Sequence, residues 1–241
     1  MTPLALPALA PGESLVAVAR VEDMADCAVP LTAEDEARIA RLVQARDRAA
    51  RGAAWRLARL CLGSVLGRAP DAVAVRRGTN GRPALAEAGD LDFNLSHTTG
   101  WVAVGLMRGG RIGVDVERAR SLSTWGHIAP EFLAAAPLAA WEALAEARRG
   151  AAALSAWCRK EAVLKATGEG LAQDARTVEV PLGGGLATLD RAGRRLTVAT
   201  LATPAPDPQE ACLAVAVEAG RLPLLLSRAA GGWSLAPARA D

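Results

Sequence analysis

Several features that define common protein classes are missing from this sequence. No apolar run reaches the roughly 18 residues that a membrane-spanning helix needs. Hydrophobic residues make up 51% of the 241 positions and charged residues 22%, which is a soluble globular balance. The formal net charge is only +2, whereas general nucleic-acid binding needs a strongly basic surface. We therefore expect no membrane and no nucleic acid among the partners.

Cysteine is also scarce. The four cysteines, at positions 27, 61, 158 and 212, form no CxxC pair and no zinc-ligand spacing, which predicts reduced thiols in a cytoplasmic protein. The first fifteen residues lack a positively charged start and contain three prolines, so we expect no signal peptide. The absence of GxxxxGK[ST], of GxGxxG after a strand, of HExxH and of GxSxG argues against P-loop, Rossmann, zinc-protease and serine-hydrolase chemistry.

Lysine is rare although basic residues are common. Of the 28 lysines and arginines, only Lys160 and Lys165 are lysine. An ammonium is a compact point charge on a flexible stem, whereas a guanidinium is a planar fork. Two lysines so close together favour a site that needs an ammonium, although a bias in composition would give the same clustering.

Arginine is concentrated between positions 38 and 68, where eight arginines stand against one acid, Asp47. This segment is either a solvated helix face or a site for phosphate or for an acidic partner. The sequence alone leaves both readings open.

The patterns along the chain predict an α+β fold. Thr32, with Asp35 three residues on, is a helix N-cap signal for an amphipathic helix that runs to about Leu66, with Gly52 as a point of interruption. Two more helices are expected over 130–147 and 152–167. Strands are expected at 15–21, 73–75, 91–95, 101–106, 111–117, 176–181, 186–190, 195–202 and 211–218. Turns are expected at 80–81, 96–100, 183–185 and 204–208.

The order of these elements predicts two similar halves. A helix carrying Trp55 is followed by three short strands, and a helix carrying Trp157 is followed by three or four more. We place an N-terminal half at 1–109, a C-terminal half at 110–226 and a flexible tail at 227–241.

The segment 111–117 alternates strictly between two kinds of residue. A strand has a period of two, so its faces consist of Ile112, Val114 and Val116, and of Gly113, Asp115 and Glu117. Asp115 and Glu117 can then reach one hard cation such as Mg²⁺, which takes one or two carboxylates. Gly113 would leave room for a ligand on that face. The alternative is a strand with a solvated polar face.

The segment 157–165 places chemistry on a helix. Trp157, Glu161 and Lys165 share one face at helical spacing, and Lys160 lies about 100° around the axis. Glu161 is a third carboxylate for the metal, a general base, or both, and the lysines would hold phosphates. The alternative is a surface Glu–Lys pair.

The expected turn at 96–100 carries hydrogen-bond donors. Ser96 and His97 can bind phosphate, or the side chains can merely cap the turn. Adjacent residues rarely form a Ser–His hydrolase dyad, and His127 has the context of a surface histidine.

Four motifs in this order resemble the 4′-phosphopantetheinyl transferase family, specifically its larger, monomeric, surfactin-synthetase type. They are Gly81-Arg82-Pro83, Phe93-Asn-Leu-Ser-His97, Ile112-Gly-Val-Asp-Val-Glu117, and Trp157-Cys-Arg-Lys-Glu-Ala-Val-Leu-Lys165 with Gly168-Glu-Gly-Leu171. The resemblance covers roughly residues 30 to 171. It departs over 121–153, where the carrier-contact surface is not predicted.

The resemblance implies a fold and a set of site residues. The fold would be α+β, with two halves related by a pseudo-twofold, each a small, mostly antiparallel sheet packed on a long helix, and with the active site between them. Mg²⁺ would be held by Asp115, Glu117 and Glu161, and Glu161 and Lys165 would be catalytic. Contacts to coenzyme A would come from Arg51, Arg82, Pro83, Ser96, His97, Asp115, Lys160 and Lys165.

The implied activity is transfer of the phosphopantetheine arm of coenzyme A to a serine of an acyl or peptidyl carrier protein by a monomeric enzyme. Adenosine 3′,5′-bisphosphate would be released. Two alternatives remain: another Mg²⁺-dependent phosphoryl or phosphodiester enzyme, and a non-catalytic coenzyme A binder of the same fold. Neither the carrier nor the pathway can be named from the sequence.

Overall fold

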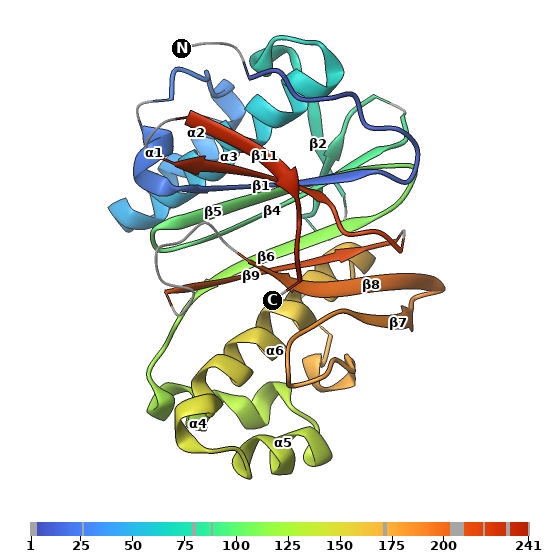
Figure 1. Cartoon of the computed structure of the whole chain (residues 1–241). Coiled ribbons are helices and arrows are strands. Elements are labelled where there is room, and N and C mark those ends of the chain that lie inside the picture. Colours follow the sequence, from blue (N-terminus) through green and yellow to red (C-terminus); the bar gives the residue numbers. More distant parts are fainter. Residues whose placement is uncertain are drawn as a thin grey trace.

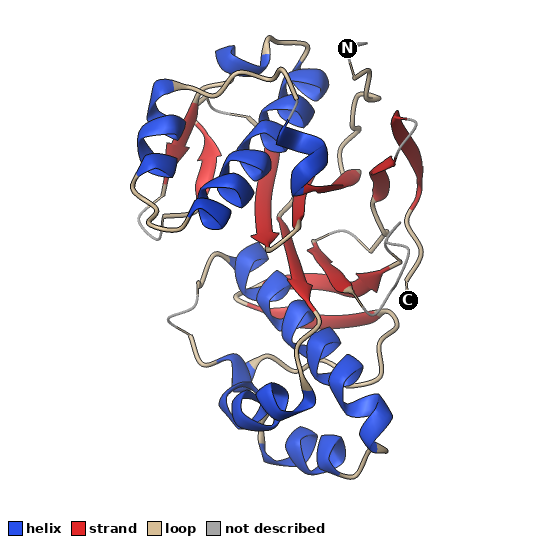
Figure 2. Ribbon diagram, turned by 90° about the vertical axis from the view of Figure 1, so that its left-hand side faces the viewer, coloured by secondary structure: helices blue, strands red, loops and turns tan. Residues whose placement is uncertain are grey.

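The chain folds into two stacked β-sheets with helices gathered above and below them (Figures 1 and 2). This computed structural model describes residues 4–25, 27–78, 81–87, 89–170, 173–202, 210–218, 220–229 and 232–240. Among these residues, no helix is both long enough and apolar enough to cross a membrane.

The first sheet has five strands in the order β11-β10-β1-β5-β4. They are β1 (Ser14–Arg20), β4 (Leu91–Thr98), β5 (Trp101–Arg108), β10 (Leu224–Ala229) and β11 (Gly232–Pro237). The β1–β10 pair is parallel and the other pairs are antiparallel. Its outer face packs on α1 (Val21–Ala25) and the long helix α3 (Ala45–Leu66), and α2 (Ala33–Ala40) packs on α3. Leu57 of α3 and Phe93 of β4 are fully buried in this core.

The second sheet has four antiparallel strands in the order β6-β9-β8-β7. They are β6 (Ile112–Arg118), β7 (Ala187–Arg191), β8 (Arg194–Leu201) and β9 (Ala211–Val217). Its outer face packs on the long helix α6 (Glu146–Thr167), with α4 (Leu122–Phe132) and α5 (Ala135–Glu142) beyond it. The α+β class, with one long helix on each sheet, is thus confirmed. The pseudo-twofold relation and the limits of the halves stay predictions.

A third core lies between the two sheets, where apolar side chains of β1 and β5 meet those of β6, β8 and β9. Beside this core, β4 and β6 are linked through the side chains of β4. Asn94 Oδ1 accepts from the Val114 backbone N–H at 2.9 Å, and Asp92 Oδ2 accepts from the Ile112 N–H at 3.0 Å. These bonds fix β6 against the first sheet.

The remaining elements are short. They are the 3₁₀ helices η1 (Pro70–Ala72) and η2 (Ala175–Thr177) and the hairpin strands β2 (Val75–Arg77) and β3 (Pro83–Leu85). Asn80, Leu171 and the expected turn at 204–208 lie outside the described residues.

The first helical region begins at the N-cap that the sequence predicts. Thr32 and Asp35 form the expected capping box, in which each side chain accepts from the other residue's backbone N–H. The helix then breaks between α2 and α3 at 41–44 and not at Gly52, which lies inside α3. Both long helices end at a glycine in the left-handed conformation, Gly67 with φ 64° and Gly168 with φ 77°.

Other expected elements were wrong. The helix expected over 130–147 is α4 and α5 with a break between them, and the strand expected over 176–181 begins instead as η2.

The tail expected over 227–241 is corrected as well. Most of it forms the end of β10 and all of β11, which extend the first sheet past β1 (Figure 1). The three consecutive leucines at 224–226 pair with β1, more than 200 positions away, and no local pattern reveals this partner.

Candidate active site

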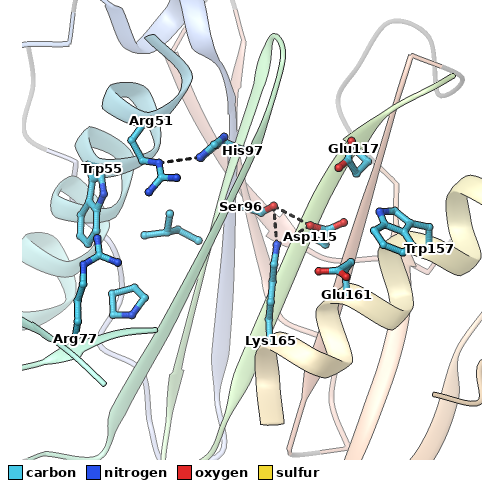
Figure 3. Close-up of a pocket in the computed structure, with 12 residues that line it drawn as sticks. Arg51, Trp55, Arg77, Ser96, His97, Asp115, Glu117, Trp157, Glu161 and Lys165 are labelled. Atoms are coloured by element: carbon cyan, nitrogen blue, oxygen red, sulfur yellow. Dashed lines mark hydrogen bonds and ion pairs between the residues drawn. The ribbon is translucent and has the colours of Figure 1, made fainter. Parts of the chain in front are cut away.

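A cavity of about 420 Å³ opens between α3 and α6, beside the β4–β6 junction. Side chains of α3 on one side and of β6 and α6 on the other line it, together with side chains of β4 (Figure 3). They are Arg51, Trp55, Arg77, Pro83, Leu95, Ser96, His97, Asp115, Glu117, Trp157, Glu161 and Lys165. The structure therefore brings together nine residues that the sequence singled out, Trp157 among them.

Strand β6 supplies two carboxylates to the cavity. Its alternation is confirmed, because Ile112, Val114 and Val116 lie in the core between the sheets while Asp115 and Glu117 face the cavity. Strand β4 donates to both carboxylates: Ser96 Oγ lies 2.9 Å from Asp115 Oδ1, and Thr98 Oγ1 lies 3.3 Å from Glu117 Oε2. The hydroxyls of β4 therefore orient the acids of β6.

Helix α6, which packs beside β6, supplies a carboxylate and an ammonium to the same end of the cavity. Trp157, Glu161 and Lys165 line the cavity, as their shared helix face predicts. Lys165 Nζ lies 2.6 Å from Asp115 Oδ1 and 2.9 Å from Ser96 Oγ. The surface-pair alternative for Glu161 is wrong, because this residue is only 6% exposed.

The three carboxylates repel one another across the cavity. Burial, and then the charge of Asp115, raises the pKa of Glu161 to about 7, with Lys165 acting in the opposite direction. Burial and Asp115 also raise the pKa of Glu117. Bringing these acids together in their ionised form is therefore costly without a positive charge between them.

Two carboxylate oxygens of this group are placed so that they could bind a cation. Asp115 Oδ2 and Glu161 Oε1 are buried and have no hydrogen-bond partner among the described residues. As placed, no three Asp, Glu, His or Cys side chains in the described part of the chain form a ready metal site. The Lys165 ammonium instead lies against Asp115. The donors are the carboxylate oxygens that Mg²⁺ prefers, so the residue types fit this ion, while the full ligand set stays a prediction.

The other end of the cavity is formed by α3 and β4. Arg51 Nε donates to His97 Nε2 at 3.0 Å, so the proton of a neutral imidazole lies on Nδ1. Burial lowers the pKa of His97 to about 4, and the charges of Arg51 and Lys165 act in the same direction. His97 is therefore a neutral ring that receives a bond from Arg51. Ser96 and His97 lie in β4 itself, which runs to Thr98, so the turn-capping alternative is wrong.

We expect His97 in the free protein to stay neutral down to about pH 4, and this predicts how stability depends on pH. Because the unfolded chain has an ordinary histidine pKa of about 6.5, it binds a proton that the folded protein refuses. The contribution of His97 to stability is thus fully present above pH 6.5 and is lost as the pH falls toward 4. Denaturant unfolding at pH 7 and pH 4.5 should show a smaller loss in His97→Gln than in the wild type. Equal losses in the two proteins would contradict the assignment.

Arg82 is not among the residues that line the cavity, and its expected contact to coenzyme A stays a prediction. Its guanidinium makes a two-bond pair with Asp92 at 2.8 and 2.9 Å and also donates to the backbone oxygens of Ile112 and Lys165. It therefore joins β4, β6 and the end of α6. A guanidinium has enough donors for this role, and the negative end of the α6 dipole favours a cation there.

Lys160 is likewise absent from the lining of the cavity, and its expected contact to coenzyme A stays a prediction. Its side chain is buried away from the cavity, where Nζ donates to the backbone oxygens of Ala175 and Val178. Burial, and then the charge of Arg191, lowers its pKa to about 8. The 100° offset from Glu161 turns Lys160 toward η2, so this lysine anchors the segment after α6.

Gly113 has a role other than the predicted one. A Cβ there would lie 2.0 Å from the backbone O of Ala162 and 2.4 Å from the N of Ala166, both in α6. The glycine therefore makes room for the helix and not for a ligand. It lets α6 approach β6 closely enough for Glu161 and Lys165 to reach Asp115.

Sequence reasoning missed three lining residues: Trp55, Arg77 and Leu95. Trp55 follows Arg51 by four positions on α3, and Leu95 precedes His97 by two on β4, so each lies on the face of a predicted site residue. Arg77 has no such signal, because it belongs to the three-residue strand β2.

Comparisons with known proteins match both parts of the chain. A family model described as "4′-phosphopantetheinyl transferase superfamily" matches residues 111–215, and one described as "4′-phosphopantetheinyl transferase, N-terminal" matches residues 20–106. The first match contains Asp115, Glu117, Glu161 and Lys165, and the second contains Arg51, Ser96 and His97.

Individual relatives share about 30% of their residues with this chain over the matched parts. The chain is 30% identical to the 4′-phosphopantetheinyl transferase AcpT of Salmonella typhimurium over 127 residues, which cover 53% of this chain and 65% of the relative. It is 30% identical to the 4′-phosphopantetheinyl transferase HetI of Nostoc sp. over 152 residues, 61% of this chain and 64% of the relative. The match thus spans a little less than two thirds of each relative. A holo-[acyl-carrier-protein] synthase structure from Thermotoga maritima aligns with 54% of this chain and 84% of its own, at 16% identity and a TM-score of 0.30.

The two family models together extend over most of the sequence. Because both describe the same family, the chain belongs to the 4′-phosphopantetheinyl transferase superfamily.

Proposed function

We propose that this protein transfers the 4′-phosphopantetheine arm of coenzyme A to a serine of an apo acyl or peptidyl carrier protein. The observation that carries the proposal is one cavity lined by three carboxylates and a lysine at one end and by Arg51 and His97 at the other. Such a site suits an anionic substrate that also binds a divalent cation.

Asp115, Glu117 and Glu161 are the residues that would hold Mg²⁺. When bound there, the ion would offset the negative charge of the coenzyme A diphosphate. The two unpartnered oxygens, on Asp115 and Glu161, support this assignment.

The reaction is a displacement at phosphorus. The carrier serine oxygen forms a bond to the β-phosphorus of coenzyme A, and the bond from that phosphorus to the bridging oxygen breaks. Adenosine 3′,5′-bisphosphate leaves with the bridging oxygen. Glu161, directly or through a water, takes the serine proton, and Lys165 offsets charge on the diphosphate.

Lys165→Met should change transfer and cation binding in opposite directions. Loss of the ammonium should lower kcat/KM about a hundredfold, because a charged contact to the diphosphate is removed. In the free protein the same change should tighten Mn²⁺ binding several-fold, since the ammonium 2.6 Å from Asp115 Oδ1 no longer competes for that carboxylate. Isothermal titration with Mn²⁺ measures the second effect. Weaker Mn²⁺ binding in the variant would contradict this role for Lys165.

Intact mass spectrometry of a carrier protein tests the proposed function. An apo carrier is incubated with coenzyme A, Mg²⁺ and this protein, and a carrier with its serine replaced by alanine is the control. We expect the carrier to gain the mass of one phosphopantetheine group and the control to gain nothing. Hydrolysis of coenzyme A without carrier would support a phosphodiesterase, and binding without turnover would support a non-catalytic binder. A panel of fatty acid, polyketide and peptide carriers would identify the preferred class.

A further inference from the structure

Two of the four cysteines, Cys158 and Cys212, meet in the core between α6 and the second sheet. Cys158 lies on α6 and is fully buried, whereas Cys212 lies on β9 and is only half-buried. Along β9, Leu213 faces the core between the two sheets, while Cys212 and Ala214 face α6. Cys158 Sγ lies 3.8 Å from the backbone oxygen of Cys212. Two thiols that share a contact between packed elements have the arrangement that a disulfide requires.

The two side chains also interact directly. Burial, and then a hydrogen bond with the Cys212 side chain, raises the pKa of Cys158. The buried thiol of Cys158 therefore stays protonated and close to the more accessible sulfur of Cys212. An oxidant in solution would reach Cys212 first.

Arg159, the next residue of α6, lacks a counter-charge. Its side chain is fully buried, and Nη1 donates to the backbone oxygens of Pro181 and Gly184 at 2.9 and 3.2 Å. Its Nε and Nη2 atoms have no hydrogen-bond partner within the described part of the chain. Burial lowers the pKa of Arg159, and the charge of Cys212 acts in the opposite direction. This guanidinium would therefore favour a negatively charged sulfur at Cys212, and a neighbouring arginine is typical of reactive thiols.

The other two cysteines provide a contrast within the same chain. Cys27 and Cys61 belong to the core of the first sheet and are 4% and 0% exposed. Burial, and then the charge of Cys27, raises the pKa of Cys61 to about 12. Thiols in such apolar surroundings are inert, so an oxidant in solution should distinguish the two pairs.

We propose that Cys158 and Cys212 are a modification site, where a peroxide converts the two thiols into a reversible disulfide that links α6 to β9. The inference goes beyond the proposed function, in which neither cysteine takes part. It rests on the contact between the two thiols, on the access of solvent to Cys212, and on the unpaired donors of Arg159.

Hydrogen peroxide supplies the oxidising equivalents in two steps. The Cys212 sulfur, having lost its proton, attacks one peroxide oxygen; the O–O bond breaks and hydroxide leaves, so Cys212 becomes a sulfenic acid. The Cys158 sulfur then attacks the Cys212 sulfur; the S–O bond breaks, and the hydroxyl group leaves as water with the Cys158 proton. In sum, two thiols and one peroxide give one disulfide and two waters.

The disulfide would constrain the carboxylates of the cavity. Cys212 is the β9 partner of Glu117 in the β6–β9 register, and Cys158 precedes Glu161 by three positions on α6. A covalent bond between α6 and β9 would therefore shift both acids. Because a displacement of about 1 Å can cost about a hundredfold in rate, we expect transfer to fall at least about tenfold. This consequence, unlike the disulfide itself, rests on the proposed function.

Peptide mapping of the whole chain after oxidation tests the site. The reduced protein is treated with hydrogen peroxide, its remaining thiols are blocked with iodoacetamide, and its peptides are identified by mass spectrometry. We expect a cross-linked peptide pair containing Cys158 and Cys212, with Cys27 and Cys61 alkylated. Dithiothreitol should return the linked pair to free thiols. In Cys158→Ala, the Cys212 sulfenic acid has no partner and should be trapped by dimedone. Cys27→Ala is the matched control and should form the same disulfide as the wild type.

Three mapping results would overturn the inference. One is equal alkylation of Cys158 and Cys212 with and without peroxide. The others are a disulfide between Cys27 and Cys61 instead, and a link between two molecules in place of a link within one.

Transfer assays test the consequence for the cavity separately. Peroxide should lower transfer by the wild type, and dithiothreitol should restore it, whereas Cys212→Ser should keep its activity in peroxide. Full transfer by the disulfide form would contradict the predicted shift of the carboxylates. If the reduced protein transferred nothing, the proposed function would fail, while a mapped Cys158–Cys212 disulfide would still support the modification site.

Discussion

Replacing Glu161 with glutamine should lower phosphopantetheine transfer at least about a hundredfold while the protein stays folded. General-base catalysis typically contributes factors of 10² to 10⁴. Glutamine keeps the size of glutamate but accepts no proton and offers a single oxygen. Glu161 has a buried oxygen with no hydrogen-bond partner among the residues that the structure describes, and burial and Asp115 raise its pKa to about 7. Its ionised form is therefore maintained at a cost in stability, which fits a residue retained for chemistry.

The Glu161→Gln protein should be at least as stable as the wild type at pH 8. A neutral amide avoids both the burial of a charge and the repulsion from Asp115. Transfer rates from carrier mass spectra and thermal unfolding at pH 8 together separate catalysis from folding. Glu146→Gln, an exposed change in the first turn of the same helix, is the control and should leave transfer unchanged, while the lost charge at the helix N-terminus costs no more than about 1 kcal/mol in stability. Wild-type transfer by Glu161→Gln would refute the assignment of the base.

Gly113→Ala should produce the largest loss of stability of any single methyl group added near the site. The new Cβ would meet backbone atoms of Ala162 and Ala166 at 2.0 and 2.4 Å. Backbone atoms of a hydrogen-bonded helix cannot rotate aside as a side chain can, so α6 must move away from β6. Overpacking of this kind costs about 1–3 kcal/mol and sometimes more, and we expect the upper end or beyond. Transfer should also fall, because Asp115 and Glu161 lie on the two elements that separate.

Gly150→Ala provides a matched comparison. Gly150 lies in the same helix α6, and a Cβ there would meet nothing within 4 Å. Alanine at a helical position should stabilise the protein by about 0.5–1 kcal/mol. Guanidinium unfolding of the two variants measures both effects. An unfolding midpoint for Gly113→Ala equal to that of the wild type would show that the helix does not approach β6 as described.

The parts of the site that follow a backbone period could be predicted from the sequence. Alternation along 111–117 correctly separated the acids from the core residues, since a strand has only two faces. The helical period placed Glu161 and Lys165 on one face, and both reach the cavity. The capping box at Thr32 is equally local, because its two hydrogen bonds span three residues.

What the sequence does not reveal are partners that lie far away along the chain. Lys160 adjoins the predicted face, but only the position of η2 decides that its ammonium meets two backbone oxygens. Arg82 became a structural link because Asp92 and two backbone oxygens surround it after folding. Gly113 was correctly seen as making space, yet the sequence could not tell whether a ligand or a helix fills that space.

Arg77 shows the same limit in reverse. It lies outside the four motifs, and in a composition with 26 arginines one more carries little information. Its place in the cavity comes from the β2–β3 hairpin and from the ring of Trp55 on α3. Charge at a site is thus assigned reliably only when the neighbours that neutralise each group are known.

The central claim is that Asp115, Glu117 and Glu161 converge on one divalent ion in the cavity, next to the diphosphate of bound coenzyme A. A crystal structure with coenzyme A and Mn²⁺ tests it most directly, because the anomalous signal locates the metal without reference to the protein chain. We predict one Mn²⁺ bound by these carboxylates, with Lys165 at the diphosphate. Coenzyme A bound outside the cavity, or a manganese peak that none of the three carboxylates contacts, would contradict the account.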